Sequence, residues 1–130
     1  MDLTDIKRLY PDNYYWDYQP LLNLLGEIVI QEDEEGYQGD SFILYKKDDQ
    51  YGYLNFGWGS CSGCDALQAC TSIEEVHSLA ETLNSDIHWG SLDTIIDYIN
   101  SRSSDYYCGS STFKVFKERV NDLEYIEQKH

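Results

Sequence analysis

Basic residues are scarce in this chain of 130 residues. Nine lysines and arginines stand against 24 aspartates and glutamates, which leaves a net charge of −15 and an isoelectric point near 4.2. Proteins that bind nucleic acids neutralise phosphates with Lys and Arg, and anionic membrane surfaces attract basic segments. The composition therefore disfavours direct binding of nucleic acid or membrane, and it favours a basic protein surface as the partner.

Long apolar runs are missing as well. The longest, Leu21–Leu25 and Ile28–Ile30, fall far short of a bilayer span, and the N-terminus has no basic-then-apolar leader pattern. We therefore expect a cytoplasmic protein. The length suits one domain, 1–130. With 42% hydrophobic and 15% aromatic residues, the chain has too much apolar content to be disordered by its charge.

Prolines are only two, Pro11 and Pro20, and the chain has no internal repeat. A short first helix, capped by Asp2 or Thr4, is expected to end at Pro11. Pro20 then starts a second helix that Gly26 ends, because proline suits the first helical turn and glycine suits the end.

The central part of the chain predicts a three-stranded antiparallel sheet, with strands over Glu27–Gln31, Ser41–Lys47 and Tyr51–Trp58. A capping box at Ser72 and Glu75 and three apolar stripes after it predict helices. The fold class is therefore α+β, with N- and C-terminal helices packed on one face of the sheet. The side chains expected to be largely buried are Leu54, Phe56, Trp58, Ile73, Val76, Leu83, Ile95, Ile96, Ile99, Phe113 and Phe116.

An acidic loop is expected between the first two strands. Five of its carboxylates should be exposed and should speed association with a basic partner by electrostatic steering: Glu32, Asp33, Glu34, Glu35 and Asp40. The alternative is that these charges only keep the protein soluble. No calcium-loop spacing and no glycine-rich phosphate cradle is present, so the sequence supports no enzyme class.

Four cysteines carry the clearest pattern. Cys61 and Cys64 have the C-x₂-C spacing of a metal knuckle, and Gly63 allows the tight turn between them. Cys70 follows after five residues, and Cys108 completes the count. Four thiolates satisfy the tetrahedral coordination of structural Zn²⁺. The sequence therefore predicts a zinc ion that staples the fold.

Other interpretations of the cysteines stay open. His77 or His88 could replace Cys108 as the fourth ligand. A C-x-x-C that opens a helix after a strand also suits a redox thiol pair, and cysteines that are simply buried and free need no metal. Disulfides are disfavoured, because the cytoplasm keeps thiols reduced.

The segment Tyr51–Cys70 also carries a resemblance. Its run Gly57-Trp58-Gly59-Ser60-Cys61-Ser62-Gly63-Cys64-Asp65-Ala66-Leu67-Gln68-Ala69-Cys70 resembles a motif of small phage and bacterial proteins, GxGSCSGCDxLxA followed by a helix and a segment like Ile87-His88-Trp89. The likeness covers about 40 residues. It implies a phage or prophage accessory protein that acts inside the bacterial host.

Small acidic proteins of this kind resemble zinc-containing anti-CRISPR inhibitors of the type II-A nuclease Cas9. The resemblance implies a non-enzymatic inhibitor that binds a basic surface of Cas9 and blocks nucleic-acid loading or cleavage, since Cas9 holds guide and target in positive channels. Two alternatives remain: a zinc-containing accessory protein that binds another host or phage protein, and a thiol oxidoreductase.

Overall fold

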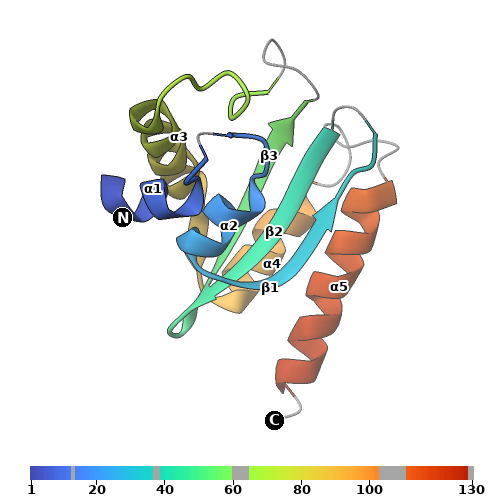
Figure 1. The fold of residues 1–130 in the computed structure, drawn as a ribbon. Helices are drawn as coiled ribbons and strands as arrows, with labels where there is room; N and C mark the ends of the chain where they lie inside the picture. The colour runs from blue at the N-terminus through green and yellow to red at the C-terminus, as the bar shows by residue number, and fades with distance from the viewer. Residues whose placement is uncertain (13, 37–38, 60–64, 103–110, 129–130) are drawn as a thin grey trace.

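Four antiparallel strands and five helices make up the part of the chain that the computed structural model describes, namely residues 1–12, 14–36, 39–59, 65–102 and 111–128. Figure 1 shows how these elements are arranged. In chain order they are α1 (Leu3–Leu9), α2 (Gln19–Leu25), β1 (Glu27–Asp33), β2 (Gly39–Lys47), β3 (Gln50–Trp58), α3 (Ile73–Asp86), β4 (His88–Gly90), α4 (Leu92–Ser101) and α5 (Ser111–Gln128).

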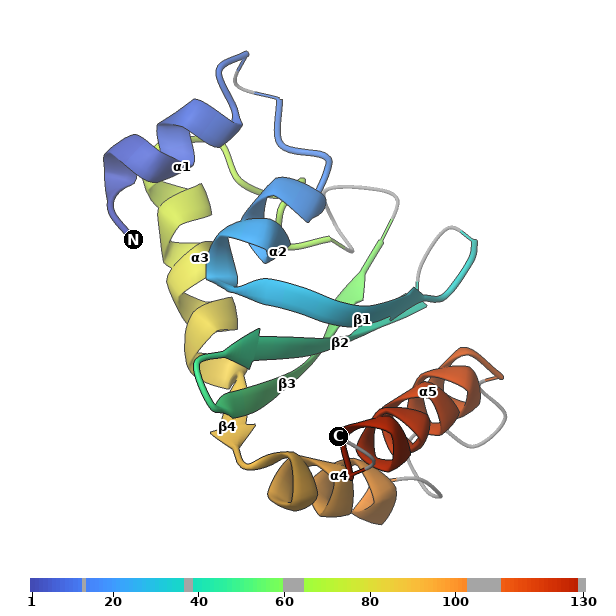
Figure 2. The ribbon, with the colours of Figure 1, turned by 90° about the horizontal axis from the view of Figure 1, so that it is seen from below.

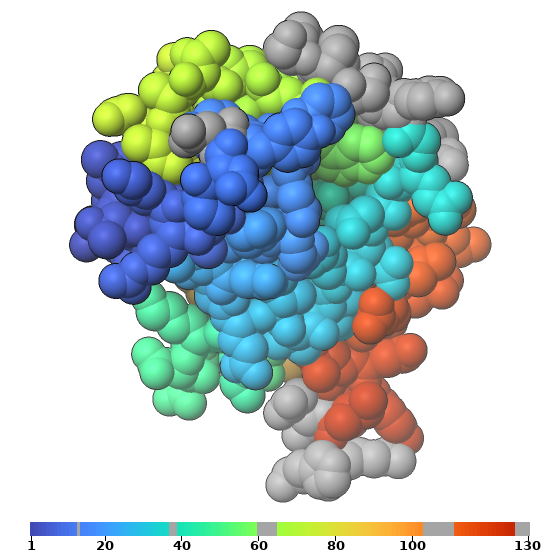
Figure 3. All heavy atoms as spheres, in the orientation of Figure 1, coloured from blue at the N-terminus to red at the C-terminus, as the bar shows by residue number. Residues whose placement is uncertain are grey.

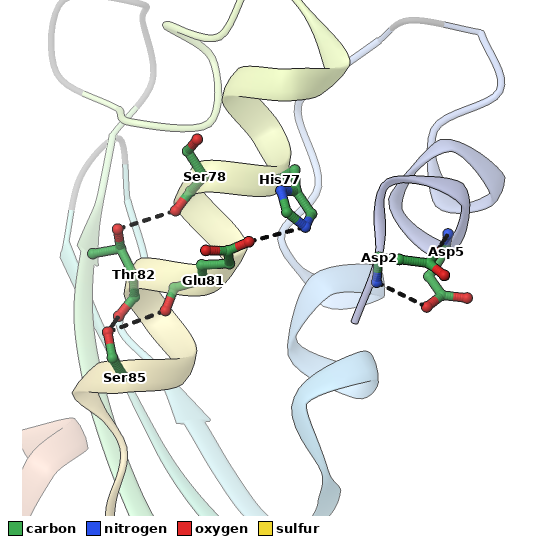
Figure 4. Close-up of polar contacts among 7 residues, drawn as sticks. All are labelled: Asp2, Asp5, His77, Ser78, Glu81, Thr82 and Ser85. Atoms are coloured by element: carbon green, nitrogen blue, oxygen red, sulfur yellow. Dashed lines mark hydrogen bonds and ion pairs between the residues drawn. The ribbon is translucent and has the colours of Figure 1, made fainter.

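Local capping sets where the helices begin. Asp2 caps α1: its Oδ1 accepts from the Asp5 amide at 3.0 Å, and Asp5 Oδ2 accepts from the Asp2 amide at 3.1 Å. Figure 4 shows this reciprocal pair. Ser72 caps α3 through the Glu75 amide, as predicted, but Glu75 returns its carboxylate to the Thr71 amide instead of the Ser72 amide. Both caps satisfy amides that the first helical turn leaves without partners.

The prediction of a three-stranded sheet was wrong by one strand. The sheet has the order β1-β2-β3-β4, and β4 pairs antiparallel with β3 through Tyr51↔Gly90 and Tyr53↔His88. With three residues, β4 is too short to show the alternation that identifies a strand in a sequence. The three predicted strands are confirmed, and the first two extend further into the acidic segment, to Asp33 and from Gly39.

Helices cover both faces of the sheet, which corrects the prediction of a single covered face. Figure 2 shows α1, α2 and α3 on one side and α4 and α5 on the other. Along β2, Ile43 and Tyr45 join the core beneath α1 to α3, whereas Phe42 and Leu44 join the core beneath α4 and α5. An unbroken apolar run of this kind is typical of a strand buried on both faces.

Most side chains expected in the core are buried. The exceptions, Phe56, Trp58 and Ile73, are partly exposed, and the first two line a groove at the sheet end. The described residues contain no helix of the length and apolarity needed to cross a membrane.

Candidate functional site

A groove lies at the end of the sheet where β1 and β3 finish and β2 begins. Its lining comes from three places: α2 and the residues that lead into it, the ends of β1, β2 and β3, and the turn that starts at Asp65. In Figure 3 the blue segment before α2, the cyan end of β1 and β2 and the green end of β3 meet at the surface. The cavity volume is about 260 Å³, which is less than the ~300–1,000 Å³ of a typical small-molecule pocket.

The floor of the groove is a row of residues across three strands. Asp33, Ser41 and Phe56 are register partners on β1, β2 and β3, so their side chains lie side by side. Trp58 Nε1 donates to Ser41 Oγ at 3.0 Å, and Ser41 Oγ donates to Asp33 Oδ1 at 2.6 Å. The row therefore ends in a carboxylate whose orientation is fixed by its neighbours.

Two glutamines join α2 to this floor. Gln19 and Gln31 exchange paired amide hydrogen bonds, both 2.9 Å long. Gln31 Nε2 also donates to both oxygens of Asp33 at 3.1 Å. At the rim, Asp17 Oδ1 accepts from the backbone N–H of Gln19 at 2.9 Å. Both carboxylates are thus held in place by amide donors.

Aromatic side chains form the groove's walls and rim. Tyr18 is buried and lies with its ring centroid 4.7 Å from that of Phe56. Trp16 lines the groove, is 52% exposed and stacks on Tyr14, with centroids 5.4 Å apart and planes 13° apart. Tyr14 is 64% exposed. Tyr and Trp are enriched in protein–protein interfaces, so two such rings stacked in solvent indicate a candidate contact surface.

Asp65 is buried beneath the groove and joins separate parts of the chain. Its Oδ1 accepts from Tyr18 Oη at 3.1 Å, from the Leu67 amide at 2.9 Å and from the Gln68 amide at 3.1 Å. Its Oδ2 accepts from the Gly59 amide at 2.8 Å. Burial raises the pKa of Tyr18, which keeps this hydroxyl protonated as a donor. Among the described residues, four donors thus bond Asp65, and together they connect α2, the end of β3 and the turn after Asp65.

The charge of the lining is of one sign. Asp17, Asp33 and Asp65 contribute carboxylates, and no lysine or arginine is among the described residues that line the groove. Trp16, Asp17 and Asp33 reach solvent, whereas Asp65 is 5% exposed. The accessible part of the groove is therefore an acidic and aromatic surface.

Of the five acidic residues predicted to be exposed, some are exposed and others are partly buried. Asp33 and Glu35 are exposed, as expected, but Glu32, Glu34 and Asp40 are partly buried. Glu32 Oε1 pairs with Arg119 Nη1 of α5 at 2.6 Å, and Glu34 Oε1 accepts from the Asp40 amide at 2.8 Å. The prediction of a wholly solvated loop was wrong for these three residues, because Glu32 lies in β1, Asp40 lies in β2, and Glu34 bonds the Asp40 amide.

Asp40 illustrates the consequence of that extension. It lies in β2, and burial is the main cause that raises the pKa of its carboxyl, with nearby Glu34 adding to the effect. A hydrogen bond from Asn55 acts in the opposite direction. Only part of the acidic segment is therefore free for a partner.

Among the predicted metal ligands, the structure describes Cys70 alone, because Cys61, Cys64 and Cys108 lie outside the described residues. Cys70 is half-buried, and its Sγ donates to the Ala66 carbonyl at 3.4 Å. Burial, then the Glu75 and Asp65 carboxylates, raise the pKa of the thiol. Within the described ranges, no three His, Cys, Asp or Glu side chains are grouped as metal ligands. The zinc site therefore stays a prediction.

The two alternative ligands have other contacts. Figure 4 shows His77 on α3, with Nε2 3.1 Å from Glu81 Oε1, an ion pair when the imidazole is protonated. His88 Nε2 lies 3.0 Å from Tyr98 Oη, and their rings stack with centroids 4.3 Å apart. His88 thus has a hydrogen-bonding partner on α4, whereas His77 Nε2 lies near a carboxylate without a hydrogen bond among the described residues.

Sequence reasoning missed the groove. In the sequence, Asp65 stands out only as part of the cysteine motif, and nothing local marks Gln19 or Gln31 as lining a groove. The exposed Tyr14 and Trp16 belong to an aromatic cluster that is visible in the sequence, but the sequence alone does not show which of its rings are buried. The groove forms from segments whose contact depends on the tertiary fold.

Comparisons with known proteins give no match of this chain to a family model, to a curated protein or to a solved structure. The resemblance carried by the Tyr51–Cys70 motif therefore stays a prediction.

Proposed function

We propose that this protein is a non-enzymatic binding protein whose groove face docks on a basic surface of another protein. The observation that carries the proposal is the exposed Tyr14–Trp16 stack beside the carboxylates of Asp17 and Asp33. Tyr and Trp are the side chains most often found as anchors in interfaces. Carboxylates around such an anchor select a partner of positive charge.

The rest of the chain supports the same interpretation. A net charge of −15 attracts a basic partner over a distance and raises the rate of encounter. The accessible carboxylates of the groove are held by hydrogen bonds from amides and a hydroxyl, so they are oriented before a partner arrives. Preorganised side chains lose less conformational entropy on binding.

The resemblance of the cysteine motif suggests which partner to test first. A positive channel that holds guide RNA and target DNA, as in Cas9, has the charge that this face would select. Occupying such a channel would block nucleic-acid loading or cleavage without any chemistry by the bound protein. Another nucleic-acid-binding protein of the host or the phage has the same kind of surface and is the alternative partner.

We also propose a structural Zn²⁺ held by Cys61, Cys64, Cys70 and Cys108. Thiolates are the donors that structural zinc prefers, and four of them leave no position for a catalytic water. Asp65 supports the site from outside, because it bonds the Gly59 amide and so connects the two ends of the segment that contains the C-x₂-C pair. The metal would add to folding stability and take no part in a reaction.

Binding to Cas9, with and without guide RNA, tests the proposal directly. The nuclease is passed over the immobilised protein at salt concentrations from about 0.05 to 0.5 M, and the association and dissociation rates are recorded at each. In a triple variant, Asp17→Asn, Asp33→Asn and Glu35→Gln, association at low salt should slow by about tenfold because steering weakens. These substitutions keep the size of each side chain.

The matched control removes three charges elsewhere. Asp49→Asn, Glu74→Gln and Glu118→Gln lie on the β2–β3 hairpin, α3 and α5, and all three are exposed. This variant has the same net charge as the first, so the two differ only in where the charges are removed. If the groove face is the contact, the control should retain most of the association rate. Equal rates for the two variants would show that charge acts only globally. Absence of binding to Cas9 and to other basic nucleic-acid-binding proteins at low salt would refute the proposal.

A further inference from the structure

We infer that the groove binds one arginine side chain of the partner, with the guanidinium between the carboxylates and the aromatic rings. This inference rests on the proposed function and specifies what the groove recognises. The cavity of about 260 Å³ is open at the surface and small. It therefore suits a single long side chain inserted from a partner better than a cofactor.

The two accessible carboxylates that line the groove, Asp17 and Asp33, are oriented by hydrogen bonds and keep capacity for a further donor. Asp33 Oδ1 accepts from Ser41 Oγ at 2.6 Å, and Gln31 Nε2 is shared between Oδ1 and Oδ2 at 3.1 Å. A carboxylate has about four acceptor positions, so Asp33 has capacity for a further donor. Asp17, at the rim, has its Oδ1 fixed by the Gln19 amide. A planar fork of five N–H donors matches fixed carboxylates better than any other cationic side chain.

The aromatic side chains supply the second half of the recognition. Trp16, Phe56 and Trp58 line the same groove. Arginine stacks on aromatic faces and is more weakly hydrated than lysine, so it gains more from a site that is partly open to water. The Trp58 indole N–H is already engaged with Ser41. Trp58 therefore contributes no free N–H donor that would compete with a cationic occupant.

Among the described residues, no cationic side chain occupies the groove that an incoming guanidinium would have to displace. The described lining contains no lysine or arginine, and the amides of Gln19 and Gln31 satisfy each other. An anion would meet Asp17 and Asp33 without a cationic partner among the described lining residues, which excludes a phosphate or carboxylate ligand on electrostatic grounds. The charge of the lining therefore favours a cation, and among cationic side chains the aromatic lining favours the planar guanidinium.

Three short peptides test the inference: acetyl-Gly-Arg-Gly-amide and the same peptide with lysine or with citrulline, the uncharged isostere of arginine. The readout is the indole N–H signals of the three tryptophans in a nitrogen-15 NMR titration. Trp16 and Trp58 line the groove, whereas Trp89 lies in β4 next to the β2–β3 hairpin and serves as an internal control. We expect the arginine peptide to shift the Trp16 and Trp58 signals and leave Trp89 unchanged.

Variants measure the contribution of each half of the site. Asp33→Asn should weaken the arginine peptide by about tenfold, because a hydrogen bond to a charged group becomes a neutral one. Trp16→Ala should weaken it by about threefold through loss of stacking. Asp49→Asn, on the distant hairpin, should leave the affinity unchanged. Trp16 is 52% exposed, so its removal should not unfold the protein, and the dispersion of the remaining indole signals verifies folding.

The outcomes separate this inference from the proposed function. Equal affinities for the arginine and lysine peptides, or shifts centred on Trp89, would overturn the arginine site. The arginine site would also be overturned if Asp33→Asn left the affinity for a basic protein partner unchanged. The proposed function would then still stand. Arginine-selective shifts that Asp33→Asn and Trp16→Ala both weaken support the site, even if Cas9 is not the partner.

Discussion

Replacement of Asp65 is the most informative test of how the site is held together. Asp65 is 5% exposed and, among the described residues, accepts from the amides of Gly59, Leu67 and Gln68 and from the hydroxyl of Tyr18. Asp65→Ala removes all four acceptor contacts. Asp65→Asn keeps the oxygen that serves three of them and turns an amide nitrogen toward the Gly59 N–H.

The structure sets the size of the two effects. A hydrogen bond to a charged group contributes about 1.5–3 kcal/mol, but Leu67 keeps a second contact with Tyr18 Oη at 3.1 Å. Water can reach part of the site through the adjoining groove and reduce the loss further. We therefore expect Asp65→Ala to lower the free energy of unfolding by about 3–5 kcal/mol, a large share of the total stability of a small domain. Asp65→Asn loses one contact and should cost about 1.5–3 kcal/mol.

Urea unfolding at pH 7, followed by far-ultraviolet circular dichroism, measures both changes. Asp49→Asn is the control, because Asp49 is exposed on the β2–β3 hairpin and its loss should cost less than about 0.5 kcal/mol. Amide exchange should accelerate at Gly59 and Gln68 before it does in β2. A cost for Asp65→Ala below about 1 kcal/mol, or a larger cost for Asp65→Asn, would refute the role assigned to this carboxylate.

Three further predictions concern the metal, the alkaline limit and the fourth strand. Cys70→Ser and Cys108→Ser should each release zinc, measured by elemental analysis, and lower the melting temperature; a full equivalent retained by Cys108→Ser would assign the fourth ligand to a histidine. Burial raises the pKa of Tyr45 above the ordinary value near 10. The contribution of its protonated hydroxyl to folding stability is therefore complete below pH 10 and is lost as the pH rises further. Tyr45→Phe should be less stable than the unsubstituted protein at pH 8 and should lose less stability in alkali. A methyl group at Gly52 would lie 2.6 to 2.9 Å from side-chain atoms in and beside β4, so Gly52→Ala should cost about 1–3 kcal/mol in thermal or urea unfolding. Gly57→Ala should cost clearly less, because the nearest atom of the described residues would lie 3.6 Å from the added methyl group.

Local patterns were sufficient to predict most of the elements. Asp2 and Ser72 cap helices as expected, Pro20 lies in the first turn of α2, and Gly26 ends that helix. In β3, Tyr51 and Tyr53 lie in one core and Leu54 in the other, as the two-residue period of a strand requires. These features depend on the chemistry of residues within about one turn or two strand positions of each other, and a sequence displays that chemistry directly.

The cysteine motif was equally visible, but its chemistry is a matter of distance between sulfur atoms. Spacing predicts that Cys61, Cys64, Cys70 and Cys108 share a metal, and the described residues show only the surroundings of Cys70. The acidic segment had a different outcome. Its composition indicated a solvated loop, whereas pairing between β1 and β2 buries part of it and directs Glu32 to Arg119.

The tertiary structure alone decided the fourth strand, the second helical layer and the groove. β4 is a strand because α3 and α4 place His88–Gly90 beside β3, where the missing side chain of Gly52 leaves room for Trp89. The groove exists because register aligns Asp33 with Ser41 and Phe56, while α2 brings Gln19 over them. The amino-acid sequence by itself determined the charge and the elements, through local propensity and composition. The binding face depended on contacts between distant segments, which have no local signature because each segment acquires its neighbours only when the chain folds.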